Sequence, residues 1–165
     1  MLIAGEWCDS EDGATSDVLN PATGEVIATT PKATISDVER CVQASRAALK
    51  SKEWAMMDPA QRGRVLQKMA AATYANAKSL AALESANTGK TFREALSEVR
   101  YGAWTLEYFA GLSDKIEGST IPGPGSRLNY TLKQPLGVTA HIVPWNFPLQ
   151  LAIRSIAPAL TAGCT

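Results

Sequence analysis

The stretch that decides the fold is GVTAHIVPWNFPL, residues 137–149. Apolar residues alternate with polar ones up to Ile142, a pattern typical of a β-strand. Pro144 ends this pattern because proline has no N–H to donate to a sheet. Pro148 suits the first turn of a helix, where the missing N–H costs nothing. We therefore predict a buried strand over 137–143, a sharp turn, and a helix from Pro148.

The turn holds three residues between the prolines, Trp145, Asn146 and Phe147. Open α/β sheets bind their ligands at the carboxyl ends of strands, which is where this turn is expected. A side-chain amide there can donate a hydrogen bond to a developing oxyanion, which is worth about 2.7–4 kcal/mol in a transition state. The structural alternative is that the aromatic rings fill the core and Asn146 caps the helix. These residues taken alone favour that alternative.

Motifs spread over the whole chain resemble the aldehyde dehydrogenase superfamily. The resemblance is carried by QPLGV at 134–138, PWNFP at 144–148 and APALTAG at 157–163. It is supported by NPATGEVIA at 20–28, TGK at 88–90 and YFAG at 108–111. The resemblance implies an α/β fold: the N-terminal part of a Rossmann-like cofactor domain, rich in helix, with a protruding β-hairpin arm.

Pattern and resemblance together divide the chain into three parts. Residues 1–115 are expected to form the N-terminal helical part of a cofactor-binding domain. Residues 116–135 are expected to form an oligomerisation hairpin, since a two-stranded ribbon is marginal alone and its edges seek partners. Residues 136–165 are expected to hold the first parallel strand, the turn and a helix. The implied partner at the hairpin is a second copy of the chain.

Helix starts and stops follow from capping signals. We predict two short N-terminal hairpins over 2–9 and 18–30, and helices that begin at a Ser36–Glu39 capping box, at Asp58-Pro59, near Ala77, at a Thr91–Glu94 capping box and at Pro148. The third helix should stop at Gly89 and the fourth near Leu112. The last should reach Thr161, and Pro158 should bend or break it.

The resemblance assigns roles to the residues of the turn and the following helix. Asn146 corresponds to the oxyanion-stabilising amide and is the candidate catalytic residue. The implied edge of a nicotinamide site, for NAD or NADP, is formed by Ile142, Val143, Pro144, Trp145 and Asn146. Phe147, Leu151 and Arg154 are spaced to share one helix face, and the resemblance implies that this face lines the aldehyde tunnel.

Arg154 has two interpretations. The resemblance to semialdehyde-type members implies that it meets an anionic tail on the substrate. The alternative is a surface or ion-pairing arginine, and that alternative is favoured.

The remaining side chains that carry chemistry are interpreted as structural. His141 is the single histidine and has no relay partner, so a structural imidazole is favoured. Cys41 is expected to fill core on its helix, and Cys164 to pack at a helix end. The three cysteines have no metal-binding or redox spacing, and no metal site is predicted. The aromatics Tyr101, Trp104, Tyr108 and Phe109 are expected in the core or at a subunit contact.

Composition excludes several classes of function. The chain has 165 residues with 45% hydrophobic content, which suffices for a real core. Sixteen Lys and Arg balance 16 Asp and Glu, so charge offers no case for a nucleic-acid or membrane partner. No apolar run reaches membrane-spanning length, and the N-terminus lacks the features of a signal peptide. The composition indicates a cytoplasmic protein.

The resemblance also implies what the chain lacks. The family's chemistry uses a cysteine thiolate that attacks the aldehyde, hydride transfer to NAD or NADP, and a glutamate that activates water. In the family's order these groups lie beyond Thr165. We therefore predict the N-terminal segment of an NAD(P)-dependent aldehyde dehydrogenase, an oxidoreductase that converts a small-molecule aldehyde to a carboxylic acid, with this chain inactive alone.

Two alternatives stay open. The chain is half of a split enzyme, or it is a non-catalytic module that binds a full-length subunit. The first interpretation, a truncated coding sequence, ranks ahead of both. All of them require that residues 137–143 form an extended sheet strand and that Asn146 does not point into solvent.

Overall fold

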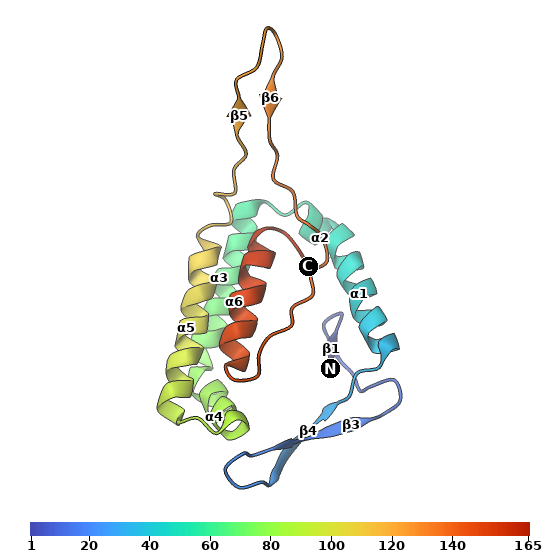
Figure 1. Cartoon of the computed structure of the whole chain (residues 1–165), viewed down its shortest axis with the longest axis vertical. Helices are drawn as coiled ribbons and strands as arrows, with labels where there is room; N and C mark the ends of the chain where they lie inside the picture. Colours follow the sequence, from blue (N-terminus) through green and yellow to red (C-terminus); the bar gives the residue numbers. More distant parts are fainter.

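Helices dominate the structure, a computed structural model that describes residues 1–165 (Figure 1). The helices are α1 (Ile35–Lys50), α2 (Lys52–Ala55), α3 (Pro59–Ala75), α4 (Ala77–Thr88), α5 (Phe92–Ala110) and α6 (Pro148–Thr161). The strands form three separate antiparallel pairs, β1 (Leu2–Ile3) with β2 (Glu6–Trp7), β3 (Thr15–Leu19) with β4 (Val26–Pro31), and β5 (Thr120–Ile121) with β6 (Asn129–Tyr130). The predicted helix-rich part of an α/β domain is confirmed.

The core lies where α3, α5 and α6 pack together. Its buried members are Leu66, Ala70, Leu106, Ala110, Ile153 and Ala157. A second cluster of small apolar residues joins α4 to α5. Gly63 lets α3 approach the end of α5 closely, since a Cβ at Gly63 would lie 2.7 Å from the carbonyl oxygen of Ala110. Burial of these faces supplies the main free energy that holds α6 in place.

The N-terminal part of the chain forms an arch on the other side of α6. Figure 1 shows α1, α2 and the two N-terminal hairpins curving round from α3, with the chain that leads into α6 running between the arch and the bundle. Two long-range hydrogen bonds fasten the arch near the C-terminus. The indole N–H of Trp54 donates to the carbonyl of Gly163 at 3.0 Å, and the hydroxyl of Thr165 donates to that of Ser45 at 3.0 Å.

Most predicted helix ends are confirmed because they depend on local hydrogen bonds. Asp58 caps α3 with Pro59 in its first turn, and Thr91 and Glu94 form the capping box of α5. Gly89 ends α4 with φ of 76°, a left-handed conformation that glycine adopts without strain. The capping box predicted at Ser36–Glu39 is wrong, because α1 starts with Thr34 and Asp37 in those roles.

Asp37 ties the start of α1 to the loop after β2. Its fully buried carboxylate accepts hydrogen bonds from the N–H of Thr34 at 2.8 Å, the hydroxyl of Ser10 at 3.2 Å and the guanidinium of Arg40 at 2.5 Å. The backbone bond from Thr34 and then the bond from Arg40 hold the pKa of this carboxyl well below its usual range.

Replacing Asp37 by asparagine should therefore lower the thermal midpoint by about 3–6 °C at pH 7. Because the folded-state pKa is depressed, the contribution of Asp37 is fully present above the unfolded pKa of about 3.9 and is lost as pH falls through the folded pKa. Thermal unfolding of both proteins from pH 7 to pH 2.5 should show the difference narrowing below about pH 4. Asp114→Asn, at an exposed carboxyl paired only with Lys115, is the control. A difference that stays constant to pH 2.5 would contradict this assignment.

Two other predictions about the elements are corrected. Pro158 does not break α6, which continues to Thr161. The carbonyl that loses its helical donor belongs to exposed Arg154, where water can bond it. Cys41 does not fill core but is exposed, because α1 packs mainly on α2 and β1 and neither covers it. The hairpin arm has only two paired residues in each strand, and every residue from 114 to 136 is exposed.

Candidate functional site

Residues 137–143 belong to no strand and bend at Val138, which corrects the predicted buried parallel strand. Their backbone bonds are both to Thr165, whose N–H donates to the carbonyl of Gly137 at 3.1 Å and whose carbonyl accepts from the N–H of Thr139 at 2.7 Å. In a parallel strand pair, one residue bonds through its N–H and its carbonyl to two residues of the other strand that lie two positions apart, as Thr165 does with Gly137 and Thr139. A ladder needs further partner backbone, and this chain offers only Thr165.

The turn between the prolines is a solvent-exposed corner, which we call the Trp145–Phe147 corner. Trp145 is 85% exposed, and the preceding Ile142 is fully exposed. Asn146 is exposed as well, so the expectation that it faces away from solvent is wrong. Its side-chain amide makes no hydrogen bond in the structure and keeps its two N–H donors free.

The corner leads directly into α6. Phe147 is the N-cap residue and makes no side-chain capping bond, so the alternative that Asn146 caps the helix is not what the structure shows. Pro148 occupies the first turn as predicted, and the N–H of Leu151 bonds to the carbonyl of Phe147 at 2.9 Å. The inward face of α6 carries Ile153 and other core residues, which fixes how the corner sits on the bundle.

The proposed tunnel residues lie along a different face of α6. Phe147 is 39% exposed, Leu151 is half-buried and Arg154 is exposed. Arg154 makes no ion pair in the structure, which leaves its guanidinium free for another group. The structure thus places Leu151 and Arg154 on α6 and Phe147 at its N-cap.

Lys90 is a residue of the site to which the sequence assigned no role. Its ammonium donates to the backbone carbonyl of Asn146 at 2.9 Å and lies 4.5 Å from the centre of the Phe147 ring. The same ammonium pairs with Glu84 at 3.3 Å and with Glu98. TGK at 88–90 marked the position, but only the folded chain shows its contact with the corner.

His141 and Cys164 are structural, as predicted. The two ring nitrogens of His141 lie 2.6 Å from the hydroxyl of Ser155 and 2.9 Å from that of Thr139, so both are partnered. The bond to Ser155 fastens the segment 137–143 to α6. Cys164 is buried at the end of that helix with 4% of its surface exposed.

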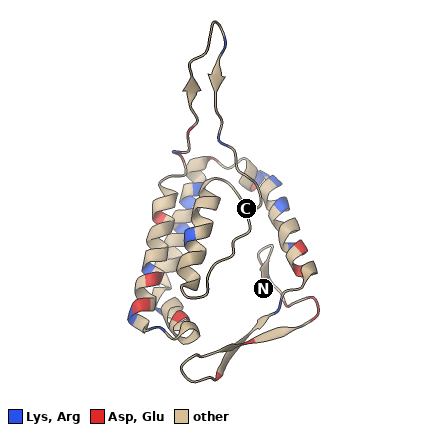
Figure 2. Cartoon of the chain, in the orientation of Figure 1, with Lys and Arg blue, Asp and Glu red and all other residues tan.

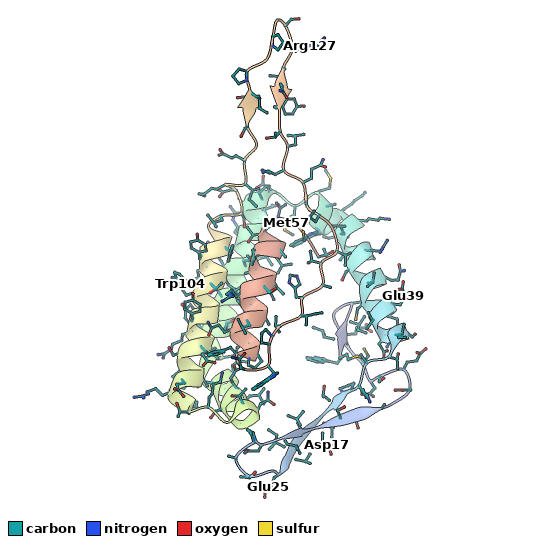
Figure 3. All side chains as sticks on the ribbon, in the orientation of Figure 1. Asp17, Glu25, Glu39, Met57, Trp104 and Arg127 are labelled. Atoms are coloured by element: carbon teal, nitrogen blue, oxygen red, sulfur yellow. The ribbon has the colours of Figure 1, made fainter.

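The aromatic residues of α5 form an exposed stripe. Tyr101, Trp104 and Tyr108 are each about half exposed, with ring centres 5.4 Å and 6.0 Å apart along the helix. Figure 3 shows Trp104 pointing outward from the bundle. A core role for these three is therefore wrong, and a subunit contact stays a prediction.

The residues present fit one edge of a dinucleotide site. Residues 142–145 form an apolar strip without helix or sheet hydrogen bonds, exposed except at half-buried Val143, which suits contact with the flat face of a nicotinamide. No glycine-rich turn leading into a helix, which would hold the pyrophosphate, occurs in the chain. The chain also has no group of three side chains placed to bind a metal ion.

Comparison with known proteins decides the family. The model of the aldehyde dehydrogenase family matches residues 7–165. The chain belongs to the aldehyde dehydrogenase family. Hydroxyisobutyraldehyde dehydrogenase of Mycolicibacterium austroafricanum is 43% identical over all of this chain and 32% of its own length. Glutarate-semialdehyde dehydrogenase of Pseudomonas putida is 42% identical over 99% of this chain and 34% of its own length.

Solved structures agree with this assignment to the aldehyde dehydrogenases. A variant of betaine aldehyde dehydrogenase from Staphylococcus aureus, in complex with NAD+, superposes with a TM-score of 0.95 at 38% identity, over 99% of this chain and 33% of that one. The chain therefore spans about a third of the length of its relatives. None of its helices combines the length and apolar character that crossing a membrane requires.

Proposed function

We propose that this chain is the N-terminal segment of an NAD(P)-dependent aldehyde dehydrogenase and contributes one wall of its active site. The proposal rests on the Trp145–Phe147 corner, where the side-chain amide of Asn146 has no hydrogen-bond partner. It also rests on the match to aldehyde dehydrogenases, which covers all or nearly all of this chain. The proposal includes the division at 1–115, 116–135 and 136–165 and a cytoplasmic location. Alone, the chain lacks the family's nucleophile and is inactive.

The residues of this wall have different roles in the proposed enzyme. The Asn146 amide donates a hydrogen bond to the aldehyde oxygen as negative charge develops there. Ile142 to Trp145 pack against the cofactor and exclude water from it. NAD or NADP, when bound, supplies the hydride acceptor. Phe147 and Leu151 line the path along which the aldehyde approaches.

The proposal is tested by completing the enzyme. This chain is joined at Thr165 to the remaining two-thirds of the S. aureus betaine aldehyde dehydrogenase, and reduction of NAD+ or NADP+ by a panel of aldehydes is followed by absorbance. We expect turnover by the joined protein and none by this chain alone. A folded joined protein with no turnover of any aldehyde would contradict the proposal, and turnover by this chain alone would contradict the missing nucleophile.

Arg154 is proposed to recognise an anionic tail on the aldehyde. It is exposed, free of ion pairs and on the same helix as Phe147 and Leu151, and one relative is named for a semialdehyde substrate. In the joined enzyme, Arg154→Ala should lower kcat/KM for an aldehyde with a carboxylate tail by about 10–100-fold, because a charge-assisted hydrogen bond is lost. kcat/KM for a neutral aldehyde of equal length should change little. An unchanged ratio between the two substrates would remove Arg154 from this role.

The hairpin arm is proposed to join two copies of the chain. It protrudes from the bundle in Figure 1, and Figure 2 shows few charged residues along it. Its strands expose unpaired edges and the side chains of Leu128, Tyr130 and Leu132. Size-exclusion chromatography with light scattering should give a mass above that of one chain. Deleting residues 118–131 should reduce the measured mass to that of one chain. A monomeric mass for the undeleted protein would contradict the proposal.

A further inference from the structure

Lys90 is held at the centre of a nearly buried charge cluster. Its side chain is 13% exposed, and its carboxylate partners Glu84 and Glu98 are 6% and 13% exposed. The backbone around it is fixed as well, because the hydroxyl of Ser85 donates to the carbonyl of Lys90 at 2.6 Å. The backbone of Lys90, just after α4, is therefore held in place. Its ammonium has three acceptors, the carboxylates of Glu84 and Glu98 and the carbonyl of Asn146.

Stability alone does not explain this arrangement. A buried ion pair gains in attraction about what it loses in desolvation, so an apolar side chain at the same place would hold α4 against α5 equally well. The cluster differs from an ordinary ion pair in its third contact. Lys90 reaches the carbonyl of Asn146, 56 residues away, with the only side-chain hydrogen bond that residues 142–147 receive. The cation–π contact of the ammonium with the Phe147 ring holds the next residue.

Both contacts of Lys90 act on the backbone that carries the Asn146 side chain. Fixing the carbonyl of Asn146 and the ring of Phe147 fixes the backbone from which the amide projects. The Asn146 amide itself has no hydrogen bond, so no other contact orients it. An oxyanion donor is effective only when its geometry is set before the reaction, since placement errors of about 1 Å cost about 10²-fold in rate.

We propose that Lys90, held by Glu84 and Glu98, is a positioning residue that anchors the Trp145–Phe147 corner and thereby aims the Asn146 amide at the aldehyde oxygen. The aim at an aldehyde rests on the proposed function; the anchoring does not. Lys90 with Glu84 and Glu98 carries a formal charge of 1 − 2 = −1, so the cluster does not repel the positive end of the α6 dipole when the ammonium binds a carbonyl there.

The test measures backbone order in this chain by ¹⁵N relaxation. In the unsubstituted protein the amides of Trp145, Asn146 and Phe147 should have order parameters near those of the helices, about 0.85, although the corner is exposed. Values below about 0.6 there would overturn the proposal without any variant. In Lys90→Met the three values should fall to about 0.6 or less while those of α3 and α5 stay unchanged.

A second variant separates anchoring from folding, because Lys90→Met leaves two carboxylates buried without a cation. The triple variant Lys90→Met, Glu84→Gln, Glu98→Gln removes all three charges and should keep the helices of the unsubstituted protein while still freeing the corner. Lys115→Met, at an exposed pair, is the control and should change nothing at the corner. An ordered corner in the triple variant would show that Lys90 does not anchor it.

The joined enzyme distinguishes this inference from the proposed function. A corner freed by the triple variant, in a joined enzyme without turnover, would refute the proposed function and leave the anchoring intact. An active joined enzyme in which the triple variant keeps its kcat would refute the positioning role alone. If the proposed function and the positioning role both hold, the triple variant of the joined enzyme should have a kcat about 10²-fold below that of its parent, with a small change in KM.

Discussion

Replacing Asn146 by alanine in the joined enzyme should lower kcat about 10²–10³-fold, the effect of removing one donor to a developing oxyanion. The reason is that the Asn146 amide has no partner within the chain and is free for the aldehyde oxygen. KM should change little, since the bond strengthens only as charge develops. Steady-state kinetics at saturating cofactor give both values.

Asn87→Ala is the matched control for Asn146→Ala. Asn87 is likewise an exposed asparagine, on α4, and nothing assigns it to the wall. Its replacement should leave kcat within about twofold, as expected for a surface substitution. Equal kcat for the Asn146→Ala enzyme and its parent would exclude the amide from oxyanion stabilisation, and a loss seen only in KM would indicate a binding role.

Replacing Gly63 by alanine should destabilise the chain by about 1–3 kcal/mol, the typical cost of overpacking a core. The added Cβ would lie 2.7 Å from the carbonyl oxygen of Ala110. That oxygen belongs to the backbone at the end of α5, so α3 and α5 must separate to admit the methyl group. Urea denaturation followed by circular dichroism measures the change as a lower midpoint.

Gly102→Ala is the comparison that isolates the cause. A Cβ at Gly102 would lie 2.9 Å from Cδ1 of Ile153, the end of a flexible side chain that can rotate away. Alanine also favours the helix by about 1 kcal/mol over glycine. We expect a change of less than about 1 kcal/mol at Gly102. Equal destabilisation by the two substitutions would mean that the backbone contact at Gly63 is not the deciding feature.

The helix boundaries could be predicted from the sequence because the interactions that make them are local. Asp58 and Pro59, Thr91 and Glu94, and Gly89 each act within one helical turn. The start of α1 was misplaced because Thr34 and Asp37 compete with Ser36 and Glu39 for the same roles. In the structure Thr34 and Asp37 form the capping box, and Asp37 accepts a further bond from Ser10, 27 residues earlier, which a local pattern does not show.

The site was predicted only in part, for a related reason. The prolines at 144 and 148 and the residues between them indicated a corner that leads into a helix, and the structure has both. The strand before the corner was wrong because a strand depends on partner backbone, and this chain provides only Thr165. Lys90 was missed because its contact with Asn146 spans 56 residues.

The exposed corner and the unpaired segment before it conflict with what the sequence interpretation required. Family membership does not depend on either, because it follows from the match over residues 7–165. In the proposed whole enzyme, the parallel pattern that Thr165 begins beside Gly137 and Thr139 continues as a sheet, and the groups that cover Asn146 come from the other two-thirds of the protein.

The most direct measurement is a crystal structure of the joined enzyme with cofactor and an unreactive aldehyde analogue. We predict residues 137–143 in a parallel strand and Nδ2 of Asn146 about 2.7–3.1 Å from the oxygen of the analogue. A structure in which Asn146 still faces solvent, with the analogue bound elsewhere, would contradict the claim that this corner forms a wall of the active site.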